Sequence, residues 1–144
     1  MPKGFSGTGE LDPTPGVQLN IWEGRYYGGD NYFHFKTNIP YSSWAMFRIE
    51  AVGYSYGAGL GIRSVWCFHT SYGSGIYNID LQNYYNGMNA HGVYNAADNF
   101  IVVRAYTPSY YSGWSLNAYT LNPTGTFNVQ ITAVAQTSNS GNYY

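Results

Sequence analysis

The sequence predicts an all-β fold, an antiparallel β-sandwich or jelly roll of about eight strands that follows an extended N-terminal arm. Three observations predict this fold. Apolar and polar residues alternate with a period of two over many short segments, which is typical of strands that bury one face. Gly, Pro and Asn recur between these segments, about every eight to fifteen residues. No long segment has the period of a helix.

The most apolar part of the chain lies between residues 98 and 135 and predicts three consecutive strands. In the last of them Phe127, Val129 and Ile131 alternate with polar residues, so one face of this strand should be buried. In the first, residues 98–106, apolar side chains occupy both faces. This strand should therefore be nearly buried on both sides.

The remaining elements follow from the same two signals, alternation and turn residues. Loops are expected at residues 23–30 and 84–95, and a glycine-rich turn at residues 57–61. The expected strands are residues 17–22, 31–37, 44–54, 62–69, 76–82, 98–106, the segment between the turns at 108–113 and 122–125, and 127–135.

Composition divides the chain into an extended arm at residues 1–16, a β-sandwich domain at residues 17–137 and a polar tail at residues 138–144. The arm holds three prolines and four glycines among few apolar residues, so it should not contribute to the core. Two interpretations of the arm stay open. It is either a frayed terminus or a segment that becomes ordered by threading over a neighbouring subunit.

Charged residues make up 9% of the chain, against about 25% in ordinary soluble domains, whereas tyrosine occurs 17 times. The surface must therefore be built mainly from Tyr, Asn, Ser, Thr, Gly and Gln. Such surfaces are typical of binding faces, where rigid tyrosines stand among small polar residues, or of faces buried against copies of the same chain. The net charge of −1 argues against nucleic acid or an anionic membrane as a partner.

The sequence contains no apolar run near the roughly 18 residues of a membrane helix. Its N-terminal residues lack the apolar segment of a signal peptide. We therefore expect synthesis in the cytoplasm. Cys67 is the single cysteine, so no intrachain disulfide can form.

No catalytic motif stands out. The seven carboxylates show no local pairing of the kind that glycosidases need, and no serine lies in a nucleophile elbow. The three histidines have no ligand spacing on one element. Glu50 is expected to pair with Arg48 or Arg104. The sequence therefore predicts no enzyme, no cofactor and no metal site, and a glycan-cleaving enzyme is the weakest of the alternatives.

Aromatic residues near the predicted strand ends carry the remaining functional signal. Platforms of this kind stack on sugar rings or fill pockets in a protein partner. Alternatively, the same rings pack over the ends of the sandwich or at a seam between copies. The candidate binding residues are Tyr26, Tyr27, Tyr84, Tyr85, Tyr110, Tyr111 and Trp114.

Five short segments together carry a resemblance to a known family. They are Phe35–Ile39, Met46–Ile49, Asp98–Arg104, Tyr110–Leu116 and Asn122–Gly125. The set resembles a β-sandwich domain of virion proteins from tailed bacteriophages, which occurs at the tips of tail or head fibres and as small surface proteins. The similarity covers about residues 17–137, and its motifs are structural rather than catalytic.

The resemblance implies a non-enzymatic virion protein displayed on the particle surface, a head decoration (cement) protein or a fibre knob, docked through its N-terminal arm. It also implies a homo-oligomer, with a trimer as the natural form, and contacts with other capsid or tail proteins. The sequence has no shaft-like repeat, which favours a small knob, a decoration protein or an excised tip of a longer fibre. The alternative function is a receptor-binding tail tip or lectin-like module that binds a host cell-surface glycan through the loop tyrosines.

Overall fold

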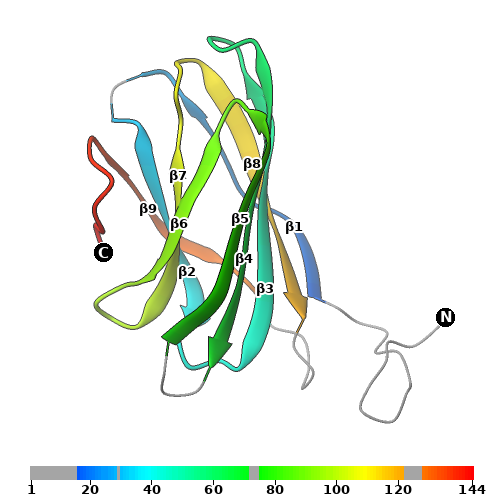
Figure 1. Ribbon diagram of the computed structural model, residues 1–144, viewed down its shortest axis with the longest axis vertical. Helices are drawn as coiled ribbons and strands as arrows, with labels where there is room; N and C mark the ends of the chain where they lie inside the picture. Colours follow the sequence, from blue (N-terminus) through cyan, green and yellow to red (C-terminus); the bar gives the residue numbers. More distant parts are fainter. Residues whose placement is uncertain (1–15, 29, 72–74, 122–127) are drawn as a thin grey trace, which may run out of the picture.

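The structure, a computed structural model, describes residues 16–28, 30–71, 75–121 and 128–144. These residues form nine strands and no helix, arranged as two antiparallel sheets of a β-sandwich (Figure 1). The predicted fold class is therefore confirmed. The strands are β1 (Gly16–Tyr26), β2 (Tyr32–Pro40), β3 (Ala45–Ser55), β4 (Leu60–Ser71), β5 (Gly75–Asn86), β6 (Asn89–Asn95), β7 (Phe100–Tyr106), β8 (Ser112–Leu121) and β9 (Ile131–Thr137).

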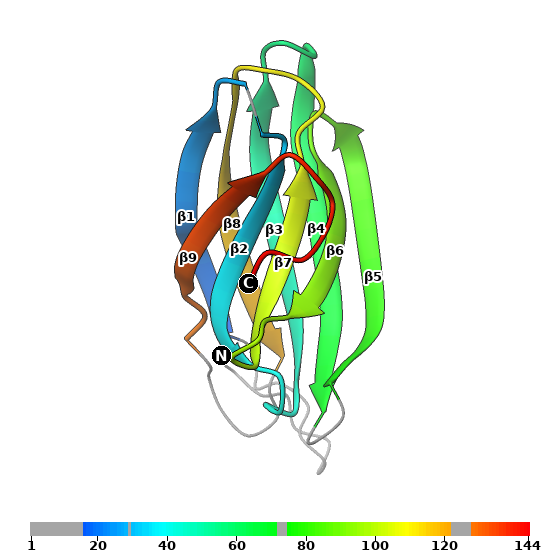
Figure 2. The ribbon, with the colours of Figure 1, turned by 90° about the vertical axis from the view of Figure 1, so that its left-hand side faces the viewer.

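The five-stranded sheet has the order β1-β8-β3-β4-β5, and the four-stranded sheet has the order β6-β7-β2-β9. Strands β3, β4 and β5 form a meander, whereas β1 pairs with β8 and β2 pairs with β7. Segments far apart in the sequence therefore lie side by side. Figure 2 shows the four-stranded sheet in front of the five-stranded sheet, with β1 and β9 along one side and β5 and β6 along the other.

The core lies between the sheets and is built from the inward positions of the alternating strands. Phe33 and Phe35 of β2 pack on Trp114 of β8, with ring centroids 4.9 and 6.4 Å from the indole. Trp66 of β4 is fully buried, and its Nε1 donates a hydrogen bond to Arg104 O of β7 at 2.9 Å. Each large side chain buried here contributes roughly 1.5–3 kcal/mol, and the Trp66 hydrogen bond also links the two sheets.

The prediction of a strand buried on both sides is confirmed for β7. Ile101 and Val103 face the core, and Val102 on the opposite face is also fully buried. The C-terminal residues 138–144 cover this outer face, where Tyr144 packs against a small cluster that contains Val102 (Figure 2). The predicted polar tail therefore lies on the four-stranded sheet.

Two predicted loops are partly strand in the structure. Strand β1 continues through residues 23–26, and the predicted loop 84–95 contains the end of β5 and the whole of β6. A β-bulge between Ala90 and Gly92 shifts the alternation of β6, which hides its period of two in the sequence. The described residues therefore contain nine strands where the sequence predicts eight.

The chain enters at one end of the sandwich, and the β3–β4 turn and the β7–β8 loop lie at the other. Strand β1 starts at Gly16 at one end and finishes at Tyr26 at the other, beside the β3–β4 turn and the β7–β8 loop (Figure 1). The chain therefore enters the sandwich at the end opposite to these two loops. The predicted arm lies outside the described residues except for Gly16, and so do Phe127 and the predicted turn at 122–125.

Candidate ligand-binding site

Two of the seven candidate binding residues, Tyr26 and Trp114, are core residues with 4% of their surface exposed. The sequence predicts Tyr26 in a loop, but β1 runs through it and its ring packs edge-to-face on Phe33 at 5.5 Å. Trp114 faces inward from β8, where its ring contacts Phe33 and Trp22. Because neither ring can reach a ligand without opening the core, both are removed from the binding set.

Three other candidates, Tyr27, Tyr110 and Tyr111, meet at one end of the sandwich, and each is more than half exposed. The ring centroid of Tyr111 lies 5.1 Å from Tyr27, 6.5 Å from Tyr110 and 5.9 Å from Tyr56. Tyr56, in the β3–β4 turn, is also exposed and is missed by the sequence argument because it is not part of a doubled tyrosine. These four residues are called the tyrosine cluster below.

Backbone hydrogen bonds between the β3–β4 turn and the β7–β8 loop hold the tyrosine cluster. Tyr56 N donates to Tyr111 O at 3.0 Å, and Gly57 N donates to Tyr110 O at 3.2 Å. Position 57 must be glycine for this approach, since a Cβ there would lie 2.3 Å from Ser109 Oγ and 2.6 Å from Tyr110 O. The glycine-rich turn predicted from the sequence thus allows two loops to meet.

Tyr111 has a left-handed backbone conformation, with a φ of 60°. This conformation costs a residue other than glycine roughly 1–2 kcal/mol, and it persists only where surrounding contacts impose it. Its ring nevertheless stays 56% exposed, so burial of the ring offsets little of this cost. An exposed bulky side chain at a strained position points to a role in binding.

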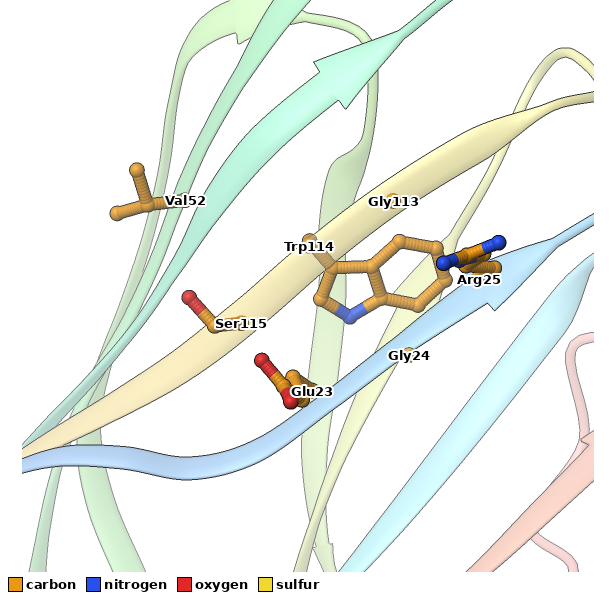
Figure 3. A pocket seen from close by; sticks show the side chains of 7 residues that line it. All are labelled: Glu23, Gly24, Arg25, Val52, Gly113, Trp114 and Ser115. Atoms are coloured by element: carbon orange, nitrogen blue, oxygen red, sulfur yellow. The ribbon is translucent and has the colours of Figure 1, made fainter.

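A hollow of about 500 Å³ lies in the outer face of the five-stranded sheet (Figure 3). It is lined by Glu23, Gly24, Arg25, Val52, Gly113, Trp114 and Ser115. Gly113 of β8 lies between Arg25 of β1 and Tyr54 of β3 in the sheet register, and its missing side chain leaves the space between them open. Arg25 Nη1 donates a hydrogen bond to the Tyr27 hydroxyl at 3.3 Å, which joins the hollow to the cluster.

More exposed tyrosines lie on the same outer face. Tyr54 is 55% exposed beside Gly113. Tyr84 and Tyr85 are also exposed, but they lie on β5, at the opposite edge of the sheet from the hollow, and not in the loop that the sequence predicts. The ring of Tyr85 covers Gly61, and that of Tyr84 has the Arg63 guanidinium 4.9 Å from its centroid. The structure therefore does not bring this pair into the tyrosine cluster.

The outer face of the five-stranded sheet is balanced in charge. The sheet register places three acids and three bases on it: Glu23, Glu50, Asp80, Arg25, Arg48 and Arg63. Glu50 pairs with Arg48 at 3.1 Å and with Arg63 at 3.3 Å. Of the two expected partners, Arg48 pairs with Glu50 within the same strand, whereas Arg104 lies on the other sheet. The cross-strand ion pair is made with Arg63 of β4. This face therefore carries no net charge that would attract a polyanion.

The described residues offer little to metal or thiol chemistry. No three His, Cys, Asp or Glu side chains among them come close enough to hold a metal ion. Burial raises the pKa of the Cys67 thiol, so this group stays protonated and weakly nucleophilic near neutral pH.

Neither a membrane-spanning helix nor a similarity to known proteins indicates what the chain does. Among the described residues, no helix has the length and apolar character needed to cross a membrane. Comparisons with protein-family models, with curated proteins and with solved structures found no match. The function must therefore be inferred from the residues and geometry of the site.

Proposed function

We propose that the protein is a non-enzymatic virion surface module that binds a neutral cell-surface glycan through the tyrosine cluster and the adjoining hollow. The observation that carries the glycan-binding part is the array of exposed tyrosine rings around Tyr111, beside a polar hollow. A tyrosine ring loses little conformational entropy on binding and offers both an apolar face and a hydroxyl group.

The chemistry of the site matches that of a sugar. The C–H groups of a pyranose stack on an aromatic ring, and its hydroxyls need hydrogen-bond donors and acceptors close by. In the hollow Arg25 supplies donors, Glu23 supplies acceptors, and Ser115 supplies both. The equal number of acids and bases on the surrounding face favours a neutral polyhydroxyl ligand over an anionic polymer.

Binding without turnover fits the residues of the hollow. Retaining and inverting glycosidases use two carboxylates about 5–9.5 Å apart across the scissile bond. Glu23 is the single carboxylate among the described residues that line the hollow. One carboxylate can hold a sugar hydroxyl, but it cannot serve as both the acid and the base or nucleophile.

The virion part of the proposal rests on the resemblance of residues 17–137 to phage fibre and decoration domains. The geometry suits this role, because the chain enters the sandwich at Gly16, at the end opposite to the tyrosine cluster. Residues 1–15 would dock on the particle while the cluster faces the host. Assembly into a homo-oligomer, with a trimer as the natural form, would bury part of the weakly charged surface.

Replacing Tyr110 and Tyr111 together with alanine is expected to weaken glycan and host-cell binding by about ten- to a hundredfold. Each lost aromatic contact is worth roughly 0.5–1.5 kcal/mol. Stability should fall by less than about 1 kcal/mol, since both side chains are more than half exposed. An array of neutral and acidic glycans measures binding, and thermal unfolding measures stability.

The matched control for this double variant is Tyr77→Ala. Tyr77 is 41% exposed near the start of β5, at the other end of the sandwich, so its loss should leave binding unchanged. Full glycan binding by the double variant would remove the tyrosine cluster from the site. A wild-type protein that binds no glycan on the array and no host cell would end the binding proposal.

Removal of residues 1–15 is expected to abolish attachment to virus particles while the sandwich stays folded. These residues precede β1, which begins at Gly16, and every residue of the described core cluster follows Gly16 in the chain. Co-sedimentation with particles that lack the protein measures docking, and far-UV circular dichroism checks the fold. Attachment of the shortened protein at full strength would contradict docking through the arm.

A further inference from the structure

The C-terminal residues 138–144 are docked on the outer face of the four-stranded sheet, and His34 of β2 lies beneath them. The tail is held there by Arg104 Nη1, which donates to Asn142 Oδ1 at 3.1 Å. The ring of Tyr143 lies 5.9 Å from the ring of His34. His34 occupies an outward position of β2, yet it is completely buried. The tail contributes to this burial.

The hydroxyl of Tyr94 links the tail to His34. Its oxygen accepts hydrogen bonds from the backbone amides of Tyr143 at 3.2 Å and Tyr144 at 3.4 Å. A phenol has one proton to donate and two lone pairs to accept. With both lone pairs engaged by the tail, Tyr94 must donate its proton to His34 Nδ1, 2.9 Å away.

The other ring nitrogen of His34 is fixed in the same way. The Thr137 hydroxyl donates its one proton to Asn139 O at 2.8 Å. Its oxygen can therefore only accept from His34 Nε2, which lies 2.8 Å away. Together these bonds require a neutral His34 with its proton on Nε2.

A proton added to His34 Nδ1 would have no acceptor. The Tyr94 oxygen could accept it only by giving up an amide of Tyr143 or Tyr144, the two bonds that hold the end of the tail. A buried donor left without a partner costs about 1–3 kcal/mol, and more when it is charged. Protonation of His34 therefore weakens the docking of the tail, and docking of the tail opposes protonation of His34.

The groups around His34 do not compensate an added charge. Strand β9 contributes no titratable side chain next to it, only Ala135 and Thr137. The titratable and charged groups on the other packed elements are Tyr32 and Lys36 on β2, His91 and Tyr94 on β6, Arg104 and Tyr106 on β7, and Tyr143 and Tyr144 in the tail. The carboxylate of Asp98 is already paired with Lys36.

We propose that the C-terminal tail is a latch on the four-stranded sheet that acid releases, and that His34 is its pH-sensing residue. When His34 takes up a proton, the tail leaves the four-stranded sheet and uncovers the apolar cluster of Tyr94, Ala96 and Val102. The sandwich itself stays folded, because its core lies on the other side of that sheet.

The direction of the pH effect follows from the pKa of His34. Burial lowers this pKa below its ordinary value of 6.5, and Arg104 lowers it further. The docked state therefore binds fewer protons than the released state, so docking is strongest above pH 6.5 and weakens as the pH falls. His91 lies nearby, where its Nδ1 accepts from Arg104 Nε at 3.3 Å, and its pKa is also lowered, chiefly by burial.

Nuclear magnetic resonance of the full chain between pH 8 and pH 5 tests the latch. At pH 8 the ring nitrogens of His34 should show the Nε2–H tautomer. The amides of Tyr143 and Tyr144 should move to the shifts of a free peptide on acidification, with the same midpoint as the titration of His34. Amides that keep their docked shifts after His34 has titrated would overturn the proposal, and so would a tail that is free at pH 8.

Two variants separate the latch from general acid unfolding. His34→Gln keeps a donor and an acceptor but cannot titrate, so its tail should stay docked to pH 5. Tyr94→Phe removes the oxygen that holds both amides, so its tail should be free at pH 8 while the core resonances persist. Release of the His34→Gln tail at the wild-type midpoint would contradict the role of His34. If that variant does not fold, a docked tail in Tyr94→Phe would contradict the latch instead.

Discussion

Replacing Gly53 with alanine is expected to lower the free energy of unfolding by about 3 kcal/mol. A Cβ at this position would lie 2.0 Å from Gly113 O and 2.7 Å from Trp114 Cα, which are backbone atoms of the neighbouring strand β8. No side-chain rotation can relieve such a contact, so β3 and β8 must move apart. Overpacking of this kind typically costs 1–3 kcal/mol and occasionally more.

The matched control is Gly61→Ala on β4. A Cβ there would meet the ring of Tyr85 at 3.5 Å, which is ordinary van der Waals contact, so stability should change by less than about 0.5 kcal/mol. Unfolding in guanidinium chloride measures both variants. Because Gly53 pairs with the residue next to Gly113, which lines the hollow, Gly53→Ala should also weaken glycan binding. Equal stability of the two variants would show that β3 and β8 tolerate the extra methyl group.

The prediction of the fold succeeded because alternation is a local property. Phe47, Ile49 and Ala51 share one face in the sequence pattern, and the structure buries all three. The alternation did not predict strand β6, where a bulge shifts which positions face the core. After the bulge of β6, Val93 faces the same side as Ala90, three positions earlier, so no period of two is visible in this strand.

The site was only partly predictable for a different reason. Doubled tyrosines pointed to Tyr27 and to Tyr110–Tyr111, which are exposed. The same signal included Tyr26, but this side chain points into the core from the last position of β1. The hollow could not be found, because it depends on the register that brings Arg25 opposite Gly113. Sequence fixes neither which strands pair over such separations nor their register.

The latch was hidden for the same reason. The sequence pattern predicted a polar tail at residues 138–144 and gave His34 no partner in it. Their connection passes through the Tyr94 hydroxyl, from a strand that the sequence pattern assigned to a loop. A hydrogen-bond network between three distant segments leaves no local signal in the sequence.

Replacing Tyr111 with glycine is expected to separate binding from stability. Glycine adopts a φ near 60° without the penalty of about 1–2 kcal/mol that tyrosine carries there. This gain is offset by the lost ring contacts and by the greater entropy of glycine in the unfolded chain. The free energy of unfolding should therefore stay within about 1 kcal/mol of the wild type, whereas glycan binding should fall several-fold, by up to about tenfold.

The contrast with Tyr26→Ala makes this experiment decisive. Tyr26 is buried next to Phe33, so its truncation should cost about 3 kcal/mol or more, as for other large aromatic side chains in a core. Unfolding in guanidinium chloride and the glycan array are applied to both variants. If Tyr111→Gly lost stability as Tyr26→Ala does and kept its affinity, Tyr111 would be a packing residue. Its left-handed backbone conformation would then be required for the conformation of the β7–β8 loop and not for ligand binding.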